Sequence, residues 1–371
     1  MEATTFWTPL KMGSIVLKNR VFMSPMTRDR STLDLVPTDR DAETSMLLYY
    51  EQRASAGLII TEATQVSADG QGYPLTPGVF TPEQIAGWKK ITDAVHDKGG
   101  KIFCQVWHCG RISHESYQPD GRAPPAPSAV LPSAGAGQVT TMEGPKPFPM
   151  PREMTVEDIK TCVEQFRQGA LNCIEAGFDG IEIHAANGYL IDQFLKDSAN
   201  FRTDDYGGSL ENRFRILREI VTACQEAIGK DKVGVHLTPG GTYNGANDRP
   251  EEATQNHEYH IKELNKMDIT YLHIKLSDEQ DERHGGKIVP MSLIRTWFTG
   301  LLVANNRFNE KEDFGDADIG KEYDAVAFAR AFLANPDLPA RIENKADLNK
   351  WDHNTFFMGG PKGYTDYPFM A

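Results

Sequence analysis

Short apolar segments recur along the chain, and longer segments of helical period separate them. Their apolar residues are continuous rather than alternating, which is typical of parallel strands covered on both faces. The eight predicted strands are Val21–Ser24, Leu58–Glu62, Ile102–Trp107, Gly180–His184, Val233–Leu237, Tyr271–Lys275, Leu301–Ala304 and Ala325–Phe328.

Three of the intervening segments predict amphipathic helices, over Pro82–Lys98, Thr155–Ala176 and Leu210–Ile228. In each of them apolar residues return every three or four positions, so that they share one face. The second begins with Thr155 and has Asp158 three residues later, which predicts a capping box at its start.

Strands that alternate with helices indicate an α/β fold, either an open doubly wound sheet or a closed barrel. The open sheet would be favoured by a Gly-x-Gly-x-x-Gly phosphate loop between a strand and a helix. The glycine clusters at 135–137 and 240–241 do not match this pattern. We therefore predict a (β/α)8 TIM barrel and one domain over residues 1–371.

The segment Gly121–Pro151 is rich in Pro, Ala, Gly and Ser, which is typical either of a linker between domains or of a long loop. The strand–helix alternation resumes in phase directly after it. We therefore expect a long excursion after the third strand, over about residues 115–151, that caps one end of the barrel.

The composition excludes some classes of partner. A net charge of −13 argues against binding to nucleic acid or to anionic membranes. The five cysteines are an odd number without a Cys-x-x-Cys pair, which indicates reduced thiols. Neither a secretory signal nor an apolar run of membrane-spanning length is visible, so we expect a cytoplasmic protein.

Barrel enzymes place their sites at the carboxyl ends of the strands. The residues there are mostly amides, hydroxyls and imidazoles, and we predict no metal site because no carboxylate cluster occurs among them. Paired glycosidase carboxylates, a Ser-His-Asp triad and a Gly-x-Ser-x-Gly elbow are also not evident. Such groups would suit the edge of a ring-shaped cofactor such as a flavin, with a phosphate near Arg330 after the last strand.

Long blocks of this sequence resemble one known family. They include PLKMGSIVLKNRVFMSPMTR, HAANGYLIDQF, DDYGGSLENR and ANPDLPARI, and the similarity extends over nearly the whole chain. The sequence resembles the Old Yellow Enzymes. This resemblance implies an FMN-binding (β/α)8 barrel that takes hydride from NADPH or NADH and reduces the activated C=C bond of α,β-unsaturated carbonyl or nitro compounds.

The resemblance also implies roles for single residues. His184 and Asn187 match the pair that binds the substrate carbonyl oxygen, and Tyr189 matches the proton donor. The residues that match flavin-binding positions are Pro25, Thr27, Ala63 and Gln105 at the ring and Arg330 at the phosphate. Trp107, Phe356 and Phe357 match positions that shape the substrate pocket.

Three positions depart from the family pattern. His236 stands where the family normally carries Arg or Lys beside the flavin, and Asn305 and Ala329 stand where it usually has Gly near the phosphate. We expect His236 to donate a hydrogen bond but to supply charge only when protonated, near neutral pH. The departures leave two alternatives open: a flavin-assisted isomerase, and a flavin-poor, weakly active ligand-binding paralogue. Either a monomer or a homodimer fits the sequence.

Overall fold

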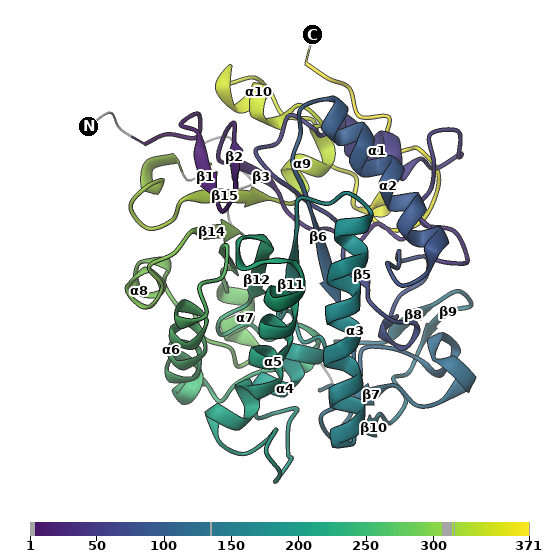
Figure 1. Ribbon diagram of the computed structural model, residues 1–371, viewed down its shortest axis with the longest axis vertical. Coiled ribbons are helices and arrows are strands. Elements are labelled where there is room, and N and C mark those ends of the chain that lie inside the picture. Colours follow the sequence, from purple (N-terminus) through teal and green to yellow (C-terminus); the bar gives the residue numbers. More distant parts are fainter. Residues whose placement is uncertain (1–3, 134–135, 306–313, 315, 371) are drawn as a thin grey trace.

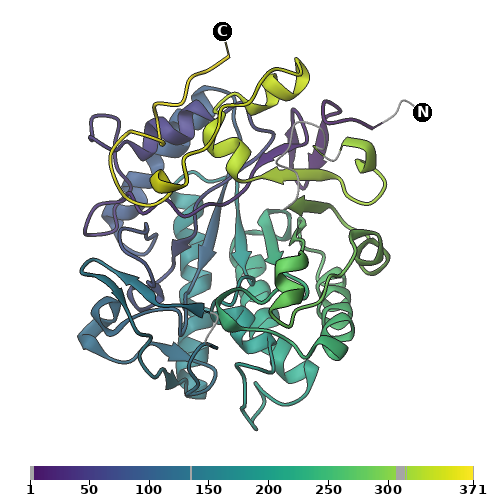
Figure 2. The same cartoon turned by 180° about the vertical axis from the view of Figure 1, so that it is seen from behind.

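The computed structural model describes residues 4–133, 136–305, 314 and 316–370. Its central feature is a closed barrel of parallel strands, seen from two sides in Figures 1 and 2. The strands are β3 (Val21–Met23), β4 (Ile59–Ile60), β6 (Ile102–Trp107), β11 (Gly180–His184), β12 (Val233–Leu237), β13 (Leu272–Lys275), β14 (Leu302–Asn305) and β15 (Ala325–Phe328). Pairing of β15 with β3 and of β11 with β6 closes the ring. The predicted (β/α)8 barrel is confirmed.

The strands lie where the apolar runs predict them, with small differences at their ends. The largest difference is at β4, which has two residues where five are predicted. The backbone leaves the ladder after β4 and returns as β5 (Thr64–Gln65), which also pairs with β6. Residue Ala63 lies in this break, so the interruption falls at a predicted cofactor position.

Helices surround the barrel. They are α1 (Met46–Gln52), α2 (Pro82–Asp97), α3 (Val156–Glu175), α4 (Leu190–Leu195), α5 (Leu210–Ile228), α6 (Pro250–Lys266), α7 (Glu279–Arg283), α8 (Met291–Trp297), α9 (Arg330–Ala334) and α10 (Leu338–Glu343). The predicted capping box of Thr155 and Asp158 starts α3. Figure 1 shows α3, α5 and α6 along one side of the barrel, where α5 packs against both of the others.

The amino-terminal half of the barrel interior is apolar. An antiparallel hairpin of β1 (Leu10–Met12) and β2 (Ile15–Leu17) packs against this layer. Phe103 and Tyr271 fill the interior, and the neighbouring strands carry Gly180 and Gly234 at the same level. A Cβ at either glycine would come within 2.5 Å of one of these aromatic rings. Glycine therefore makes room for large side chains in the barrel.

The excursion (residues 115–151) lies between β6 and α3, after the third barrel strand as predicted. It contains β7 (Pro125–Ala126), which pairs with β10 (Arg152–Glu153), and a hairpin of β8 (Val139–Thr141) and β9 (Gly144–Lys146). Figures 1 and 2 place it at the end of the molecule away from α10 and the β1–β2 hairpin. Its role as a cap within a single domain stays a prediction.

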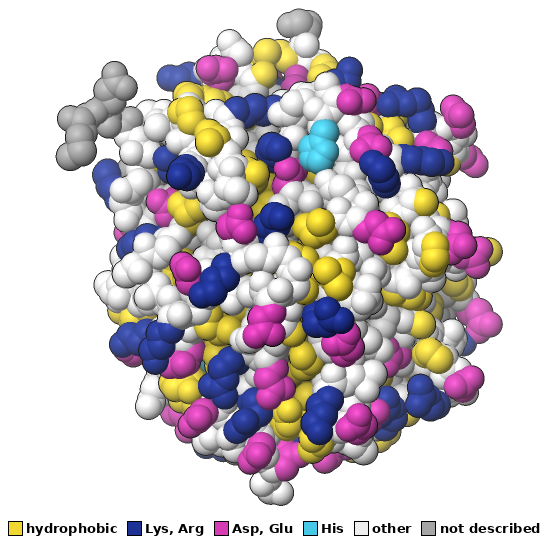
Figure 3. All heavy atoms as spheres, in the orientation of Figure 1, with side chains coloured by type: hydrophobic (Ala, Val, Ile, Leu, Met, Phe, Trp, Pro, Cys, Tyr) yellow, Lys and Arg dark blue, Asp and Glu magenta, His cyan; other side chains and the backbone are white. Residues whose placement is uncertain are grey.

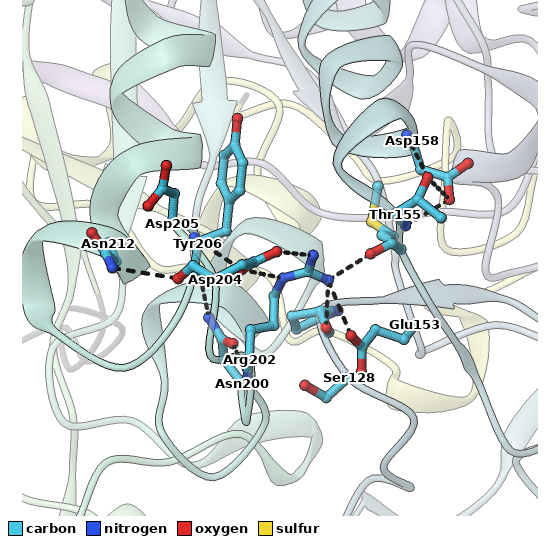
Figure 4. Close-up of polar contacts among 12 residues, drawn as sticks. Ser128, Glu153, Thr155, Asp158, Asn200, Arg202, Asp204, Asp205, Tyr206 and Asn212 are labelled. Carbon is cyan, nitrogen blue, oxygen red and sulfur yellow. Dashed lines mark hydrogen bonds and ion pairs between the residues drawn. The ribbon is translucent and has the colours of Figure 1, made fainter.

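The side chain of Arg202 joins the excursion, at Pro127, to the segment that follows it, at Met154 (Figure 4). Its Nη1 donates to the carbonyl oxygens of Pro127 and Met154 at 3.0 and 2.5 Å, and Asp204 accepts from its Nε at 3.0 Å. Pro127 lies within the excursion and Met154 lies just beyond it. One buried guanidinium therefore ties chain positions that are 27 residues apart.

The surface and the cysteines agree with the composition. Acidic and basic side chains intermingle on the face shown in Figure 3. All five cysteines are buried and free. Among the described residues, every helix is too short or too polar to cross a bilayer.

We expect Arg202→Met to lower the free energy of unfolding by about 2–3 kcal/mol, because it leaves two buried carbonyl groups without a donor. Urea unfolding followed by circular dichroism measures this. Arg215→Met is the matched control, since it removes one exposed hydrogen bond to the carbonyl of Asp205 and should change the stability far less. Equal effects of the two substitutions would contradict this role for Arg202.

Candidate active site

Three candidate residues follow one another where β11 ends. His184 is the last residue of the strand, Asn187 and Gly188 turn the chain in left-handed conformations at φ 56° and 74°, and Tyr189 caps the start of α4. A Cβ at position 188 would lie 2.4 Å from the carbonyl oxygen of Tyr243, so this position requires glycine. The Gly188 amide donates to Asp192 in α4 at 2.8 Å. The turn brings the three side chains to one side of the barrel end.

The hydrogen bonds of His184 and Asn187 leave one donor free on each. The Ala186 amide donates to Nδ1 of His184 at 3.3 Å, and burial lowers the His184 pKa to about 3. The imidazole is therefore neutral with its proton on Nε2. Thr238 donates to Oδ1 of Asn187 at 3.2 Å, which leaves the Nδ2 amide. Neither donor has a partner among the described residues.

The phenol of Tyr189 is held by aromatic neighbours. Its ring meets Trp107 edge-on with centroids 4.8 Å apart, and it meets His184 at 5.1 Å. Its hydroxyl lies 3.0 Å from the hydroxyl of Tyr73, whose ring stacks on Trp107. Burial raises the pKa of Tyr189 well above 10. The hydroxyl therefore keeps its proton at any working pH and can act as an acid.

Two adjoining cavities at this end of the barrel collect most of the predicted residues. A smaller cavity of about 110 Å³ is lined by Pro25, Thr27, Ala63, Gln105, Trp107, His184, Asn187, Tyr189, His236 and Tyr243. A larger one of about 290 Å³ is lined by Ser24, Pro25, Met26, Asn187, His236, Tyr243, Lys275, Asn305, Ala327, Ala329 and Arg330. They share Pro25, Asn187, His236 and Tyr243, so they adjoin each other along these residues.

The two C-terminal phenylalanines lie elsewhere. Phe356 is 4% exposed and packs with Leu333 and Ala334, and its carbonyl accepts from Arg28 at 2.8 Å. Phe357 is 53% exposed. Neither lines the two cavities, so their role in shaping the substrate pocket stays a prediction.

A chain of polar side chains crosses the barrel beneath the cavities. The Asn305 amide donates to Ser24 Oγ at 2.6 Å and to His273 Nε2 at 3.0 Å. His273 Nδ1 donates to one oxygen of the buried Glu182 at 2.9 Å, and Gln105 Nε2 donates to the other at 2.8 Å. Every side chain in this network has at least one partner, as a polar network in a dry interior requires, while the Gln105 amide oxygen has none among the described residues.

His236 joins this chain at one nitrogen only. Its Nδ1 lies 3.2 Å from the Gln105 amide nitrogen, which donates to it and leaves the imidazole proton on Nε2. That Nε2 is buried without a partner among the described residues. Burial, with His273 and His184 nearby, holds the pKa of His236 well below 6.5. His236 is therefore a neutral donor, and its titration lies below the neutral range that the sequence suggests. An unpaired buried donor at the cavity wall fits a ring cofactor with acceptor atoms on its edge.

Glu182, His236 and His273 also bring atoms that could ligate a metal within 4.8 Å of one another. The two imidazole rings stack nearly parallel, 4.2 Å apart with 13° between their planes. Glu182 meanwhile accepts from Gln105 and His273. The prediction that there is no metal site stays a prediction.

Several residues that line the cavities or support the site escape the sequence analysis. Lys275 ends the sixth strand and therefore carries the same positional signal as the predicted residues. Glu182 and His273 are polar residues inside otherwise apolar strands, which is also a usable signal. Tyr73 and Tyr243 lie in loops, where no pattern in the sequence marks them.

At the other end of the larger cavity, Arg330 is the first residue of α9 and is exposed. Asn305 directs its amide into the barrel, toward Ser24 and His273. Ala329 lies between β15 and α9 and is partly buried. These three residues line the same cavity, as the predicted phosphate site requires.

Comparison with known proteins supports the same assignment. The family model described as NADH:flavin oxidoreductase / NADH oxidase matches residues 5–349. The chain is 43% identical to 12-oxophytodienoate reductase 2 of Arabidopsis thaliana over 377 residues, which cover 100% of this chain and 96% of the relative. It is 44% identical to putative 12-oxophytodienoate reductase 11 of Oryza sativa subsp. japonica, covering 98% and 97%.

Solved structures agree in fold as well as in sequence. Morphinone reductase in complex with tetrahydroNAD superposes with a TM-score of 0.89 at 42% identity, covering 100% of this chain and 98% of that chain. The Old Yellow Enzyme homologue of Zymomonas mobilis superposes with a TM-score of 0.91 at 39% identity, covering 99% and 100%. The chain therefore belongs to the Old Yellow Enzyme family of FMN-dependent oxidoreductases.

Proposed function

We propose that this protein uses FMN and NAD(P)H to reduce the activated C=C bond of α,β-unsaturated carbonyl or nitro compounds. One observation carries the proposal. The free donors of His184 and Asn187 lie beside the neutral, buried phenol of Tyr189, in a cavity that continues over the barrel end. Two donors and one acid are the groups that such a reduction needs from a protein.

FMN fits the two adjoining cavities at the barrel end. The donor on His236 Nε2 and the free oxygen of the Gln105 amide match the polar edge of a flavin, and Pro25, Thr27 and Ala63 line the same wall. Arg330, with Asn305 and Ala329, would hold the phosphate. Bound FMN supplies the hydride, which NAD(P)H provides in turn.

The chain's own residues act on the substrate. His184 Nε2 and Asn187 Nδ2 donate to the carbonyl or nitro oxygen and stabilise the negative charge that develops there, as an oxyanion hole does. Tyr189 gives its proton to the carbon beside the activating group, as a general acid. Trp107 and Tyr73 fix the Tyr189 ring, so little reorientation is needed when the proton moves.

The relatives support this choice of substrate class and coenzyme. Their names describe reductases of 12-oxophytodienoate and of morphinone, and the morphinone reductase structure holds a nicotinamide analogue. A small apolar carbonyl compound is consistent with a cavity walled by Trp107, Tyr189 and Tyr243.

The decisive experiment is the visible spectrum of the purified protein. We expect a yellow protein that bleaches anaerobically with NADPH or NADH and regains its colour when cyclohexenone is added. A colourless protein that cannot be loaded with FMN would instead support the flavin-poor ligand-binding alternative. Bleaching without reoxidation, together with movement of the double bond in the enone, would support the isomerase.

We predict that Tyr189→Phe slows enone reduction by about a hundredfold to ten-thousandfold, because it removes the general acid. FMN binding and reduction by NAD(P)H should stay unchanged, since Tyr189 acts only on the substrate. Stopped-flow absorbance separates these two half-reactions. Tyr73→Phe is the control, because it removes only the hydroxyl contact to Tyr189 and should slow reduction about tenfold or less. Equal losses in both half-reactions would argue against a proton-donating role.

We predict that the rate of enone reduction is flat from about pH 5 to pH 9. His184 loses its proton near pH 3 and is therefore neutral throughout this range. Tyr189 keeps its proton throughout, because its pKa is raised. Stopped-flow reoxidation across this range tests the prediction, and a bell-shaped profile with a midpoint near pH 6–7 would mean that a charged imidazole takes part.

A further inference from the structure

The last residue of β13, Lys275, places an amine in the larger cavity. Among the described residues it makes no hydrogen bond and no ion pair. Its one charge-specific contact is with the face of Tyr243, whose ring centre lies 5.7 Å from Nζ. Lys275 also lines a third cavity of about 630 Å³. This third cavity shares Tyr243 and Arg330 with the cavity of about 290 Å³ described above. Burial lowers the pKa of Lys275, and the carboxylates of Asp281, Asp278 and Asp192 favour its charged form from a distance without forming an ion pair with it. A partly buried ammonium group without a direct ion pair is costly unless a ligand provides one.

The charge balance of the larger cavity is one-sided. Its wall contains two cationic side chains, Lys275 and Arg330, and no carboxylate. The imidazole of His236 in the same wall is neutral, since burial lowers its pKa well below 6.5. A cavity of this kind favours a ligand that carries negative charge at two separate places.

Lys275 and Arg330 come from different strands of the barrel, although they line the same cavity. Lys275 stands on β13, which pairs with β12 through His236 and His273. It faces Asn305 across the ladder with β14. Arg330 follows β15, one strand further along. The charge of Lys275 is close enough to His184 and His236 to contribute to the lowering of both their pKa values. Lys275 thus acts on residues that line the ring end of the site, and it is also close enough to Arg330 for the two positive charges to oppose each other.

We propose that Lys275 supplies the positive charge beside the flavin ring that opposes the negative charge gained on reduction. This inference rests on the proposed function, because it requires FMN in the cavity. A single cation on β12 could provide both a hydrogen bond and a positive charge beside the flavin, and here two residues share these functions. His236 provides a hydrogen-bond donor without charge, and Lys275 on the neighbouring strand provides the charge. A cation near a flavin ring stabilises the reduced form more than the oxidised form, and so raises the reduction potential.

The test is the midpoint potential of bound FMN, measured anaerobically against a reference dye. Lys275→Met should shift the reduction equilibrium at least tenfold toward oxidised FMN, which is about 30 mV for a two-electron couple. Lys275→Arg keeps the charge and should stay near the wild-type potential. Lys275→Gln is the second neutral variant and serves if the Met variant does not retain FMN.

A rescue variant sharpens the test. Adding His236→Arg to Lys275→Met returns a cation to the neighbouring strand and should recover most of the lost potential. An unchanged potential in both neutral variants would overturn the inference.

Affinities for FMN and riboflavin, measured by flavin fluorescence, distinguish a role of Lys275 at the flavin ring from a role at the phosphate. If Lys275 acts at the ring, Lys275→Met should affect FMN and riboflavin affinity alike. A loss confined to FMN, with an unchanged potential, would show that Lys275 holds the phosphate, and would also overturn the inference. Wild-type protein that cannot bind FMN would refute the proposed function itself. If wild-type protein binds FMN and reduces enones, an unchanged potential in the Lys275 variants refutes only the inference about Lys275.

Discussion

The site depends on one buried carboxylate. Glu182 lies inside the barrel on β11 and accepts hydrogen bonds from Gln105 on β6 and His273 on β13. Because a carboxylate only accepts, it fixes which way the Gln105 amide points and which nitrogen of His273 carries the proton. Gln105 in turn fixes His236, and His273 fixes Asn305. Groups on four other strands are therefore oriented by one residue, and the donor on His236 is left without a partner at the cavity wall.

The neutral and charged groups of the site are arranged for different tasks. The groups that would meet the substrate, on His184, Asn187 and Tyr189, are uncharged donors, so they can stabilise developing charge without binding an anion tightly beforehand. The cations Lys275 and Arg330 lie instead in the cavity that we propose for FMN, and FMN is anionic. This division leaves uncharged donors at the substrate end and places both cations where they favour retention of FMN.

The sequence predicts the barrel and the clustering of His184, Asn187 and Tyr189 well, and the rest of the site less completely. The eight strands are visible because both of their faces are covered, so their apolar runs are continuous. The apolar spacing of α3 predicts that Val163 and Ile174 share its buried face, but in the structure these two are only partly buried, while Cys162 and Cys173 are buried. Small cysteines suit the close approach of a helix to its neighbours, and a scale of apolar size underrates them.

The difference between the two ends has a physical cause. His184, Asn187 and Tyr189 come from six consecutive positions, and the left-handed turn at Asn187 and Gly188 brings them together, so most of their geometry is local in the sequence. The cofactor end is assembled from single residues at the ends of many strands, and its polarity follows from contacts such as those of Glu182 and Asn305 across the barrel. A substitution there changes the charge of the whole cavity rather than one contact. It follows that the identity of residue 236 cannot be interpreted alone, because a side chain on the next strand shares its electrostatic environment.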